Sequence, residues 1–261
     1  MKILFIGDIV GKPGREAVKV LLAELKSEFG LDIIVANAEN SAGGLGLTPK
    51  TVNELFSYGV DILTTGDHIW DRKEILEIIE HPQLLRPLNL AVNCPGKGFC
   101  LLKKRDIEIC VVNLLGRVFM DPVDCPFQKI KDLLSELKKK ADIIIVDFHA
   151  EATSEKKAMG YFLDGEVSAV LGTHTHVQTA DEKILEKGTA YITDVGMTGS
   201  FDSVIGQEKI KIITKFLTGM PVGFRVAERD IRLDAVIIDI DLTTRRANSI
   251  ERISRPLLKC I

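Results

Sequence analysis

Residues 167–176 read Val-Ser-Ala-Val-Leu-Gly-Thr-His-Thr-His, a short apolar run that ends in two histidines one residue apart. A run of this length and composition predicts a buried strand over 167–172. His174 and His176 are expected to share one face of an extended segment, because alternate residues of a strand point to the same side. Two imidazoles at the end of a buried strand indicate a site at the edge of a sheet, where α/β proteins bind ligands.

The same arrangement recurs at four other apolar runs, which predict strands over 2–7, 33–38, 61–65 and 142–148. Each run is followed at once by residues that bind metals or transfer protons: Asp8, Glu39, Asn40, Asp67, His68 and His149. The carboxyl ends of parallel strands meet at one edge of a sheet. We therefore expect these side chains to lie close together in the folded chain.

The segments between these runs have the apolar spacing of helices. Helices are predicted over 15–29, 48–58, 72–80, 126–140, 152–162 and 207–218, and the glycine-rich segment 11–14 is predicted to be a loop. Further strands are predicted over 98–103, 107–114, 189–193 and 231–241, the last of these being the final strand. Strand–helix alternation predicts parallel pairing, and the 98–114 hairpin adds antiparallel pairing. We expect an α/β fold of two mixed sheets packed face to face, with helices outside and one domain over 1–261.

The composition narrows the class of protein. A formal net charge of −3 disfavours extended nucleic acid and membrane surfaces as partners, and 46% hydrophobic residues supply a large core. No apolar stretch is long enough for a membrane span or a signal peptide. The five cysteines, Cys260 among them, form no CxxC pair and are expected to be free thiols. These features predict a cytoplasmic protein.

Seven of the residues at the strand ends are candidate metal ligands: Asp8, Glu39, Asn40, Asp67, His149, His174 and His176. Carboxylate, amide and imidazole ligands without thiolate suit Mn, Fe, Zn or a similar divalent ion. Seven ligands are too many for one tetrahedral ion, so two metals bridged by one carboxylate account for them better. Taken singly, Asp8 also fits a turn cap and His149 fits a hydrogen-bonded structural histidine. Their recurrence in one structural position favours the metal site.

Five motifs together resemble the calcineurin-like metallophosphoesterases: Gly7-Asp8-Ile9-Val10-Gly11, Asn37-Ala38-Glu39-Asn40, Thr65-Gly66-Asp67-His68-Ile69-Trp70-Asp71, Gly172-Thr173-His174-Thr175-His176 and Asp194-Val195-Gly196-Met197-Thr198-Gly199. More narrowly, the chain is similar to the bacterial YmdB-like branch, described as 2′,3′-cyclic nucleotide phosphodiesterases. The resemblance runs essentially the full length. It implies an α/β/β/α sandwich with a dinuclear metal site at one edge.

The resemblance also implies a role for each residue of the site. Asp8, Asn40 and His176 would hold one metal. Asp67, His149 and His174 would hold the other, and Glu39 would bridge the two. The ions expected are iron or manganese ahead of zinc or magnesium. His68 would not bind metal but would face the substrate phosphate.

Two positions depart from the superfamily pattern. Val10 stands where most of the superfamily has a histidine, a gap that the YmdB-like branch shares, and Asn40 is expected to fill it. Asp67 stands where both the superfamily and the branch have asparagine. With Asp8 and Glu39, it brings three negative charges to two divalent ions. The hypothesis that follows is tighter metal binding with weaker Lewis acidity and weaker attraction for phosphate.

The expected reaction is phosphodiester hydrolysis, in which a hydroxide bridging two metals attacks phosphorus and His68 protonates the leaving alkoxide. A 2′,3′-cyclic nucleotide would open to a monophosphate, and the resemblance to the YmdB-like branch implies that this is the 3′-phosphate. Expected partners are a small phosphodiester or cyclic nucleotide, RNA fragments, and a second copy of the chain in a homo-oligomer. Asp71 fits either a group that orients His68 or a helix N-cap. Residues 41–46 fit either a phosphate cradle or an ordinary loop.

Two other functions stay open on the same residues. One is a phosphomonoesterase or nuclease that uses the same metals. The other is a regulatory protein with a weakly active metal site, a reading to which Asp67 gives weight. A serine hydrolase is disfavoured, because the sequence contains no GxSxG motif.

Overall fold

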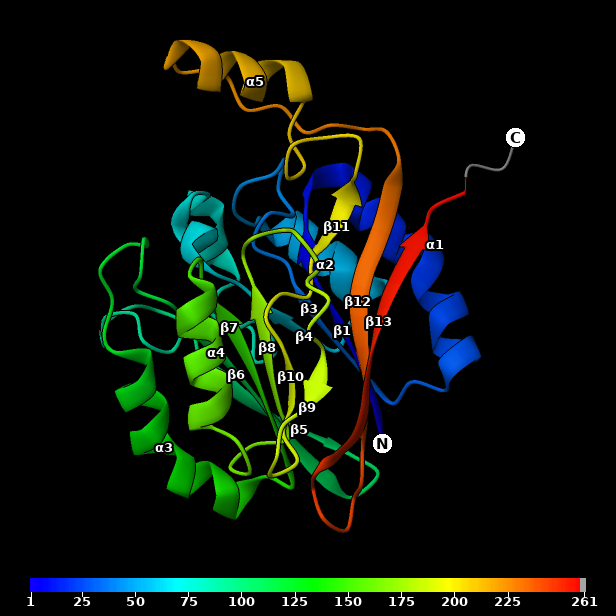
Figure 1. The fold of residues 1–261 in the computed structure, drawn as a ribbon, viewed down its shortest axis with the longest axis vertical. Helices are drawn as coiled ribbons and strands as arrows, with labels where there is room; N and C mark the ends of the chain where they lie inside the picture. Colours follow the sequence, from blue (N-terminus) through cyan, green and yellow to red (C-terminus); the bar gives the residue numbers. More distant parts are fainter. Residues whose placement is uncertain (259–261) are drawn as a thin grey trace.

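The structure is a computed structural model that describes residues 1–258, so Cys260 lies outside the described residues. Two β-sheets stack face to face and helices cover both outer faces (Figure 1). The predicted α/β/β/α arrangement of two mixed sheets is confirmed. Within the described residues, no helix is both long and apolar enough to cross a membrane.

The first sheet has the strand order β2-β11-β12-β1-β3-β4, and β13 pairs with the free edge of β12. Its strands are β1 (Lys2–Ile6), β2 (Asp8–Ile9), β3 (Ile33–Asn37), β4 (Ile62–Thr64), β11 (Met197–Ser200), β12 (Ile231–Ile240) and β13 (Ala247–Pro256). β1, β3 and β4 are parallel, whereas β12 runs antiparallel to β1. The three parallel strands therefore end at the same edge of the sheet.

The second sheet has the strand order β5-β6-β7-β8-β10-β9. Its strands are β5 (Phe99–Lys104), β6 (Ile107–Leu115), β7 (Ile143–His149), β8 (Ala169–Thr173), β9 (Lys183–Ile184) and β10 (Ala190–Ile192). β6, β7, β8 and β10 are parallel, and β5 forms the predicted hairpin with β6. In the register of β7 and β8, His149 pairs with Thr173, which places two site motifs side by side.

Helices α1 (Gly11–Phe29) and α2 (Pro49–Ser57) cover the first sheet, and α3 (Pro126–Lys140) and α4 (Thr153–Phe162) cover the second (Figure 1). Two short 3₁₀ helices, η1 (Asp67–Trp70) and η2 (Lys73–Glu77), follow β4. Helix α5 (Lys209–Thr218) projects away from the sheets at the end where the site motifs gather (Figure 1). Ile212 is the residue of α5 that is buried.

The stacking of the sheets follows from strands that are apolar on both faces. In β1, Leu4 and Ile6 pack under α1, while Ile3 and Phe5 point into the layer between the sheets. That middle layer also takes side chains from the second sheet, such as Val111. Burial on both faces explains why the N-terminal run lacks the apolar–polar alternation of a half-exposed strand.

Three predicted elements differ in the structure, and the short strands β2, β9 and β11 were not predicted. The loop predicted over 11–14 is the first turn of α1, where Pro13 is tolerated because the early N–H groups of a helix have no internal partner. The helix predicted over 72–80 is only the 3₁₀ helix η2. The final strand is β13 rather than β12, and the sequence did not reveal it because most of β13 is exposed and polar.

Candidate metal centre

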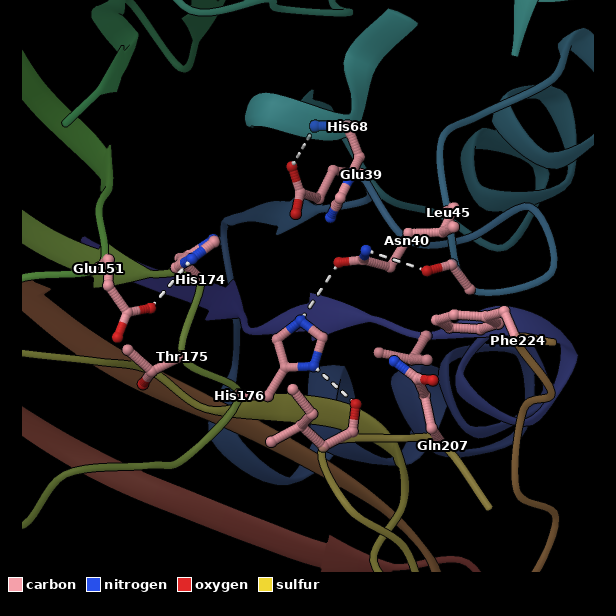
Figure 2. A pocket seen from close by; sticks show the side chains of 13 residues that line it. Glu39, Asn40, Leu45, His68, Glu151, His174, Thr175, His176, Gln207 and Phe224 are labelled. Carbon is pink, nitrogen blue, oxygen red and sulfur yellow. Dashed lines mark hydrogen bonds and ion pairs between the residues drawn. The ribbon is translucent and has the colours of Figure 1, made fainter. Parts of the chain in front are cut away.

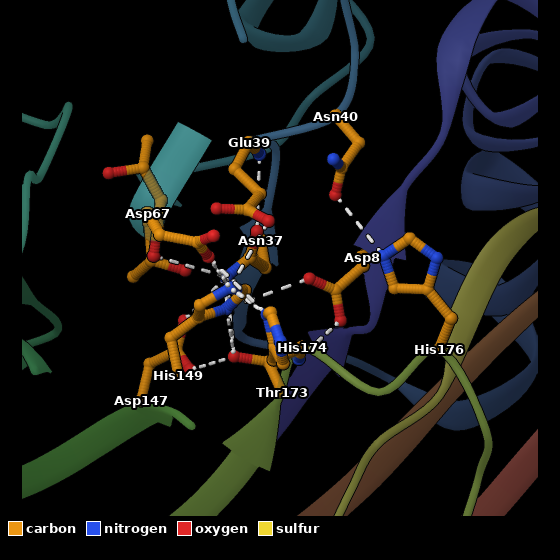
Figure 3. A network of polar contacts seen from close by, with 12 residues as sticks. Asp8, Asn37, Glu39, Asn40, Asp67, Asp147, His149, Thr173, His174 and His176 are labelled. Carbon is orange, nitrogen blue, oxygen red and sulfur yellow. Dashed lines mark hydrogen bonds and ion pairs between the residues drawn. The ribbon is translucent and has the colours of Figure 1, made fainter. Parts of the chain in front are cut away.

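The predicted site residues do come together at the carboxyl ends of the parallel strands (Figure 3). Asp8 follows β1, and Glu39 and Asn40 follow β3. η1, after β4, carries Asp67 and His68. In the second sheet, His149 is the last residue of β7, and His174 and His176 follow β8. The two sheets thus bring residues more than a hundred positions apart to one place.

The centre of the site is a four-residue cluster. His149 Nε2 lies 3.0 Å from Asp67 Oδ1 and 3.1 Å from Glu39 Oε1. His174 Nδ1 lies 3.0 Å from His149 Nε2 and 3.3 Å from Asp67 Oδ1. One donor atom from each of these four residues lies within 4.8 Å of the others, which is the spacing of ligands around one cation.

A second group lies beside this cluster. His176 Nε2 is 3.2 Å from Asn40 Oδ1. Asp8 accepts the backbone N–H of His174 at one oxygen, over 3.1 Å. Its other oxygen, Oδ1, is buried without a hydrogen-bond partner among the described residues, 3.7 Å from His149 Nδ1. A buried carboxylate oxygen without a partner is costly unless a cation neutralises it, so the donor set fits divalent metal ions.

The charges of the centre also indicate a cation site. Burial opposes ionisation of Asp67, but hydrogen bonds from His149 and His174 outweigh it and hold its pKa well below the ordinary value. Burial also opposes protonation of His149, but the carboxylates of Glu39, Asp67 and Asp8 raise its pKa well above the ordinary value. Without a metal ion, an imidazolium thus provides the positive charge that the carboxylates require. Metal binding would displace that proton.

Each imidazole is held through the nitrogen that points away from the centre. His149 Nδ1 is 2.9 Å from Thr173 Oγ1, whose hydroxyl donates to Asp147 over 2.7 Å. His174 Nε2 is 3.1 Å from Glu151 Oε2, and His176 Nδ1 is 3.1 Å from the carbonyl of Ile205. Such contacts fix the tautomer, leaving a lone pair directed at the centre of the cluster, where it could bind a metal. The free nitrogen is Nε2 in His149 and His176 but Nδ1 in His174.

The segment that carries His174 and His176 is not extended, so the expectation that both share one strand face is wrong. β8 ends at Thr173, and both histidines have positive φ angles, 102° and 63°. This backbone turn aims the two side chains at different partners, His174 at Asp67 and His176 at Asn40. Residues with side chains rarely adopt such angles, and they persist only where the surroundings enforce them.

Gly66 is required by the packing of the centre. A Cβ at this position would lie 2.2 Å from Glu39 Oε2 and 2.2 Å from His149 Cδ2. Any side chain would therefore displace two of the candidate ligands. The glycine before Asp67 thus has a steric role, which the motif alone does not reveal.

His68 lies outside the four-residue cluster, as expected. Its Nδ1 is 2.9 Å from Asp71 Oδ2, and its side chain is 34% exposed and borders the pocket over the site. Arg72 rather than Asp71 occupies the N-cap of η2, and no side chain caps that helix. Of the two roles considered for Asp71, contact with His68 is the one that the structure shows.

The pocket above these residues has a volume of about 280 Å³. Figure 2 shows two sides: Glu39, Glu151 and His174 on one, Leu45, Gln207 and Phe224 on the other. The volume lies just below the range of about 300–1,000 Å³ for small-molecule sites. The pocket therefore suits a small ligand, no larger than a mononucleotide.

The glycine-rich loop 41–46 is a fixed turn. The N–H groups of Ala42 and Gly44 bond within the turn, to Gly46 and Asn40. Asn40 Nδ2 donates to Gly44 O over 3.1 Å, which leaves Asn40 Oδ1 directed at His176. The contacts of the loop therefore favour a role in positioning Asn40 over a role as a phosphate cradle.

The sequence assigned no role to five residues around the ligands: Asp147, Glu151, Lys156, Thr173 and Asp194. Asp147 is wholly buried, which raises its pKa to about 6. A carboxylate inside the apolar run 142–148 was the one available signal, because such a group needs a partner. Thr173 and Asp194 lie within the motifs that carry the family resemblance, but the motifs alone do not reveal their contacts, and Glu151 and Lys156 give no signal in the sequence.

Comparisons with known proteins agree with this architecture. A model of the YmdB-like protein family matches residues 4–253. The 2′,3′-cyclic-nucleotide 2′-phosphodiesterase of Bacillus subtilis is 51% identical over 254 residues, which cover 97% of this chain and 96% of that protein.

Solved structures show the same fold. A hypothetical protein from Thermus thermophilus superposes with a TM-score of 0.93 at 43% identity, over 98% of this chain and 99% of that one. A structure described as a novel phosphatase, from Mycoplasma pneumoniae, gives a TM-score of 0.93 at 40% identity. The match covers 98% of this chain and 93% of that one. NAD nucleotidase of Haemophilus influenzae shares the fold alone, with a TM-score of 0.60 at 13% identity, over 98% and 56%.

Proposed function

This chain belongs to the YmdB-like protein family, and we propose that it is a metal-dependent phosphodiesterase that hydrolyses 2′,3′-cyclic nucleotides and other small phosphodiesters. The observation that carries the proposal is the group of carboxylate, amide and imidazole donors beneath a nucleotide-sized pocket. The identity of 51% with a Bacillus subtilis 2′,3′-cyclic-nucleotide 2′-phosphodiesterase supports the substrate class.

Two divalent ions, iron or manganese ahead of zinc or magnesium, are proposed to occupy the site. Asp8, Asn40 and His176 would hold one ion. Asp67, His149 and His174 would hold the other, and Glu39 would bridge them. The support is that Asp67, His149 and His174 cluster with Glu39, and that His176 faces Asn40 over 3.2 Å. Asp8 lies between these groups, 3.7 Å from His149, with one buried oxygen that lacks a partner among the described residues. Bound divalent ions supply an activated water at neutral pH and polarise phosphoryl oxygens.

His68 is proposed to deliver the proton to the leaving oxygen. Asp71 Oδ2 accepts a hydrogen bond from His68 Nδ1, so Nε2, which lies 3.8 Å from Asp67 Oδ2, is the nitrogen left to transfer the proton. Water adds to phosphorus and releases a proton to solvent, the bond between phosphorus and O2′ breaks, and a proton passes from His68 to O2′. His68 then recovers a proton from solvent. The product is the 3′-nucleotide. The His68–Asp71 contact also limits rotation of the imidazole, which keeps the proton donor oriented.

A phosphomonoesterase activity is the second candidate, because the similar Mycoplasma pneumoniae structure is described as a phosphatase. A regulatory role with a weakly active site is the third, and Asp67 is the residue that supports it. A cytoplasmic location, a single domain over 1–261, RNA fragments as partners and a homo-oligomer stay predictions of the sequence.

The test compares the manganese-loaded protein on 2′,3′-cyclic AMP and on p-nitrophenyl phosphate. We expect turnover of the diester to 3′-AMP and at most weak turnover of the monoester. Turnover of the monoester alone would make the chain a phosphomonoesterase, and inactivity on both would favour the regulatory role. His81→Asn is a control variant that should keep the activity of the unchanged protein. His81 stacks on Phe56 with ring centroids 4.5 Å apart and does not border the pocket.

Metal content measured by mass spectrometry tests the ligand assignment separately from activity. Two equivalents of manganese per chain are expected for the unchanged protein. Glu39→Gln is expected to lower binding at both positions, whereas Asn40→Ala should weaken only one. A single equivalent in the unchanged protein would refute the dinuclear site.

A further inference from the structure

We propose that Phe224 forms a wall on which the base of a nucleotide substrate stacks, and that Gln207 contacts the edge of that base. The inference rests on the proposed function and extends it from phosphate chemistry to substrate recognition. It assigns a role to the side of the pocket that the metal ligands do not occupy (Figure 2).

The pocket has two chemically different sides. One side carries the candidate ligands and His68, which act on phosphate. The other side is apolar and is formed by Val10, Leu45, Ile205 and Phe224. Phosphate and ribose are polar, so an apolar wall gains nothing from them, whereas the planar face of a base gains stacking and burial.

The backbone around Phe224 is anchored although α5 projects from the body. The chain leaves the body at Gln207 and returns at Phe224, and the two passages are bonded to each other. Glu208 N donates to Arg225 O over 3.0 Å, and Ala227 N donates to Gly206 O over 2.9 Å. The segment that follows Phe224 is therefore bonded to the chain that precedes α5.

The ring of Phe224 is seated against the turn at Gly44. A Cβ at residue 44 would lie 2.2 Å from Phe224 Cε1 and 2.5 Å from Cζ, so only glycine leaves room for the ring. Phe224 is still 37% exposed and borders the pocket. A ring that is already held in place loses little conformational entropy when it binds a base.

Gln207 supplies the polar group that such a wall needs for selectivity. Its backbone N–H and carbonyl are bonded to Val204, both over 2.9 Å. Within residues 1–258, its side-chain amide makes no hydrogen bond, and it borders the pocket. An amide offers both donors and an acceptor, which match the edge of a base.

The test uses two cyclic diesters that differ in the base. 2′,3′-Cyclic AMP has a base, whereas glycerol 1,2-cyclic phosphate has the same five-membered phosphate ring without a base. Phe224→Ala is expected to lower kcat/KM for 2′,3′-cyclic AMP about tenfold, mainly through KM, as loss of an aromatic partner does for stacked bases. For glycerol cyclic phosphate, kcat/KM of Phe224→Ala should stay within about twofold of that of the unchanged protein. Phe224→Tyr should retain kcat/KM on both substrates.

Phe216→Ala is the matched control, because Phe216 lies on α5, is 81% exposed and does not border the pocket. It should leave both substrates unaffected. An equal loss on both substrates in Phe224→Ala, or no loss on either, would overturn the proposal. Gln207→Leu should change the ratio of kcat/KM between 2′,3′-cyclic AMP and 2′,3′-cyclic UMP. An unchanged ratio would show that Gln207 does not contact the base.

The failure of the proposed function would be visible separately. If the unchanged protein hydrolyses neither cyclic diester, the phosphodiesterase proposal fails. Calorimetry with 3′-AMP and glycerol 3-phosphate then tests the wall alone. Phe224→Ala should weaken binding of 3′-AMP about tenfold and leave glycerol 3-phosphate unchanged. Equal affinities of the variant and the unchanged protein for 3′-AMP would refute the wall.

Discussion

Lys156 Nζ donates a hydrogen bond to Asp194 Oδ2 over 2.6 Å, and both side chains are buried. The same oxygen accepts the backbone N–H of Thr175 over 3.0 Å and its hydroxyl over 2.8 Å. Thr175 lies between His174 and His176, whose backbones have positive φ angles. A buried ion pair beneath the site therefore holds the turn that carries two candidate ligands.

Replacing Lys156 by methionine should lower the free energy of unfolding by about 3–5 kcal/mol, because it leaves the Asp194 carboxylate buried without its cation. Urea denaturation of the metal-free protein measures the change. Lys157→Met is the control, since Lys157 is half exposed and lies 3.7 Å from Asp181, and it should change stability by less than about 1 kcal/mol. Equal effects of the two substitutions would show that the Lys156–Asp194 pair does not hold the turn.

His68→Ala should lower kcat for 2′,3′-cyclic AMP by about 10²- to 10⁴-fold, the usual contribution of a general acid. Metal content should not change, because His68 lies outside the ligand cluster. The loss of kcat should be much smaller with methyl p-nitrophenyl phosphate as the substrate, because its leaving group needs no proton. A similar loss on both substrates would exclude His68 as the proton donor.

Asp71→Asn should reduce kcat by about tenfold, a smaller loss than in His68→Ala, because it weakens only the contact that orients the imidazole. Steady-state kinetics on the double variant checks the coupling. The double variant should have the same kcat as His68→Ala alone. Additive losses would mean that Asp71 acts independently of His68.

Asp67→Asn should release metal faster, because the site loses one of three carboxylates while His149 and His174 stay in place. Turnover of the fully loaded enzyme should not fall, since the less neutralised metals attract phosphate more strongly. Chelator competition measures metal loss, and kinetics at saturating manganese measures turnover. Unchanged values for both would refute the hypothesis about this carboxylate.

Asp234 on β12 should make the stability of the protein fall as pH rises from about 4 to 6. Its buried side chain has one oxygen without a partner among the described residues, and burial raises its pKa from 3.8 to about 6. The folded state therefore binds more protons than the unfolded state in this range, and the loss is complete above pH 6.

Asp234→Asn removes that titration, so the stability of the variant relative to the unchanged protein should rise between pH 4 and 7, by up to about 3 kcal/mol. Urea denaturation at pH 4, 5, 6, 7 and 8 follows the difference. A difference that is the same at every pH would show that Asp234 ionises normally in the folded protein.

The fold was largely predictable because its central strands are buried on both faces and read as unbroken apolar runs. β1, β3 and β7 are found within one residue of their predicted ends. β13 was missed because it pairs along the free edge of β12 and exposes most of its side chains, which removes the apolar run.

The sequence by itself determined which residues gather at the candidate metal centre, because a parallel strand delivers the residue after it to one edge of its sheet whatever the details of packing. Only the tertiary structure decided how those residues point. The turn at His174 and His176, the contacts of Glu151 and Asp71, and the placement of Phe224 against Gly44 join segments far apart in the chain. Local periodicity carries no information about such contacts, since they arise only when separate elements pack together.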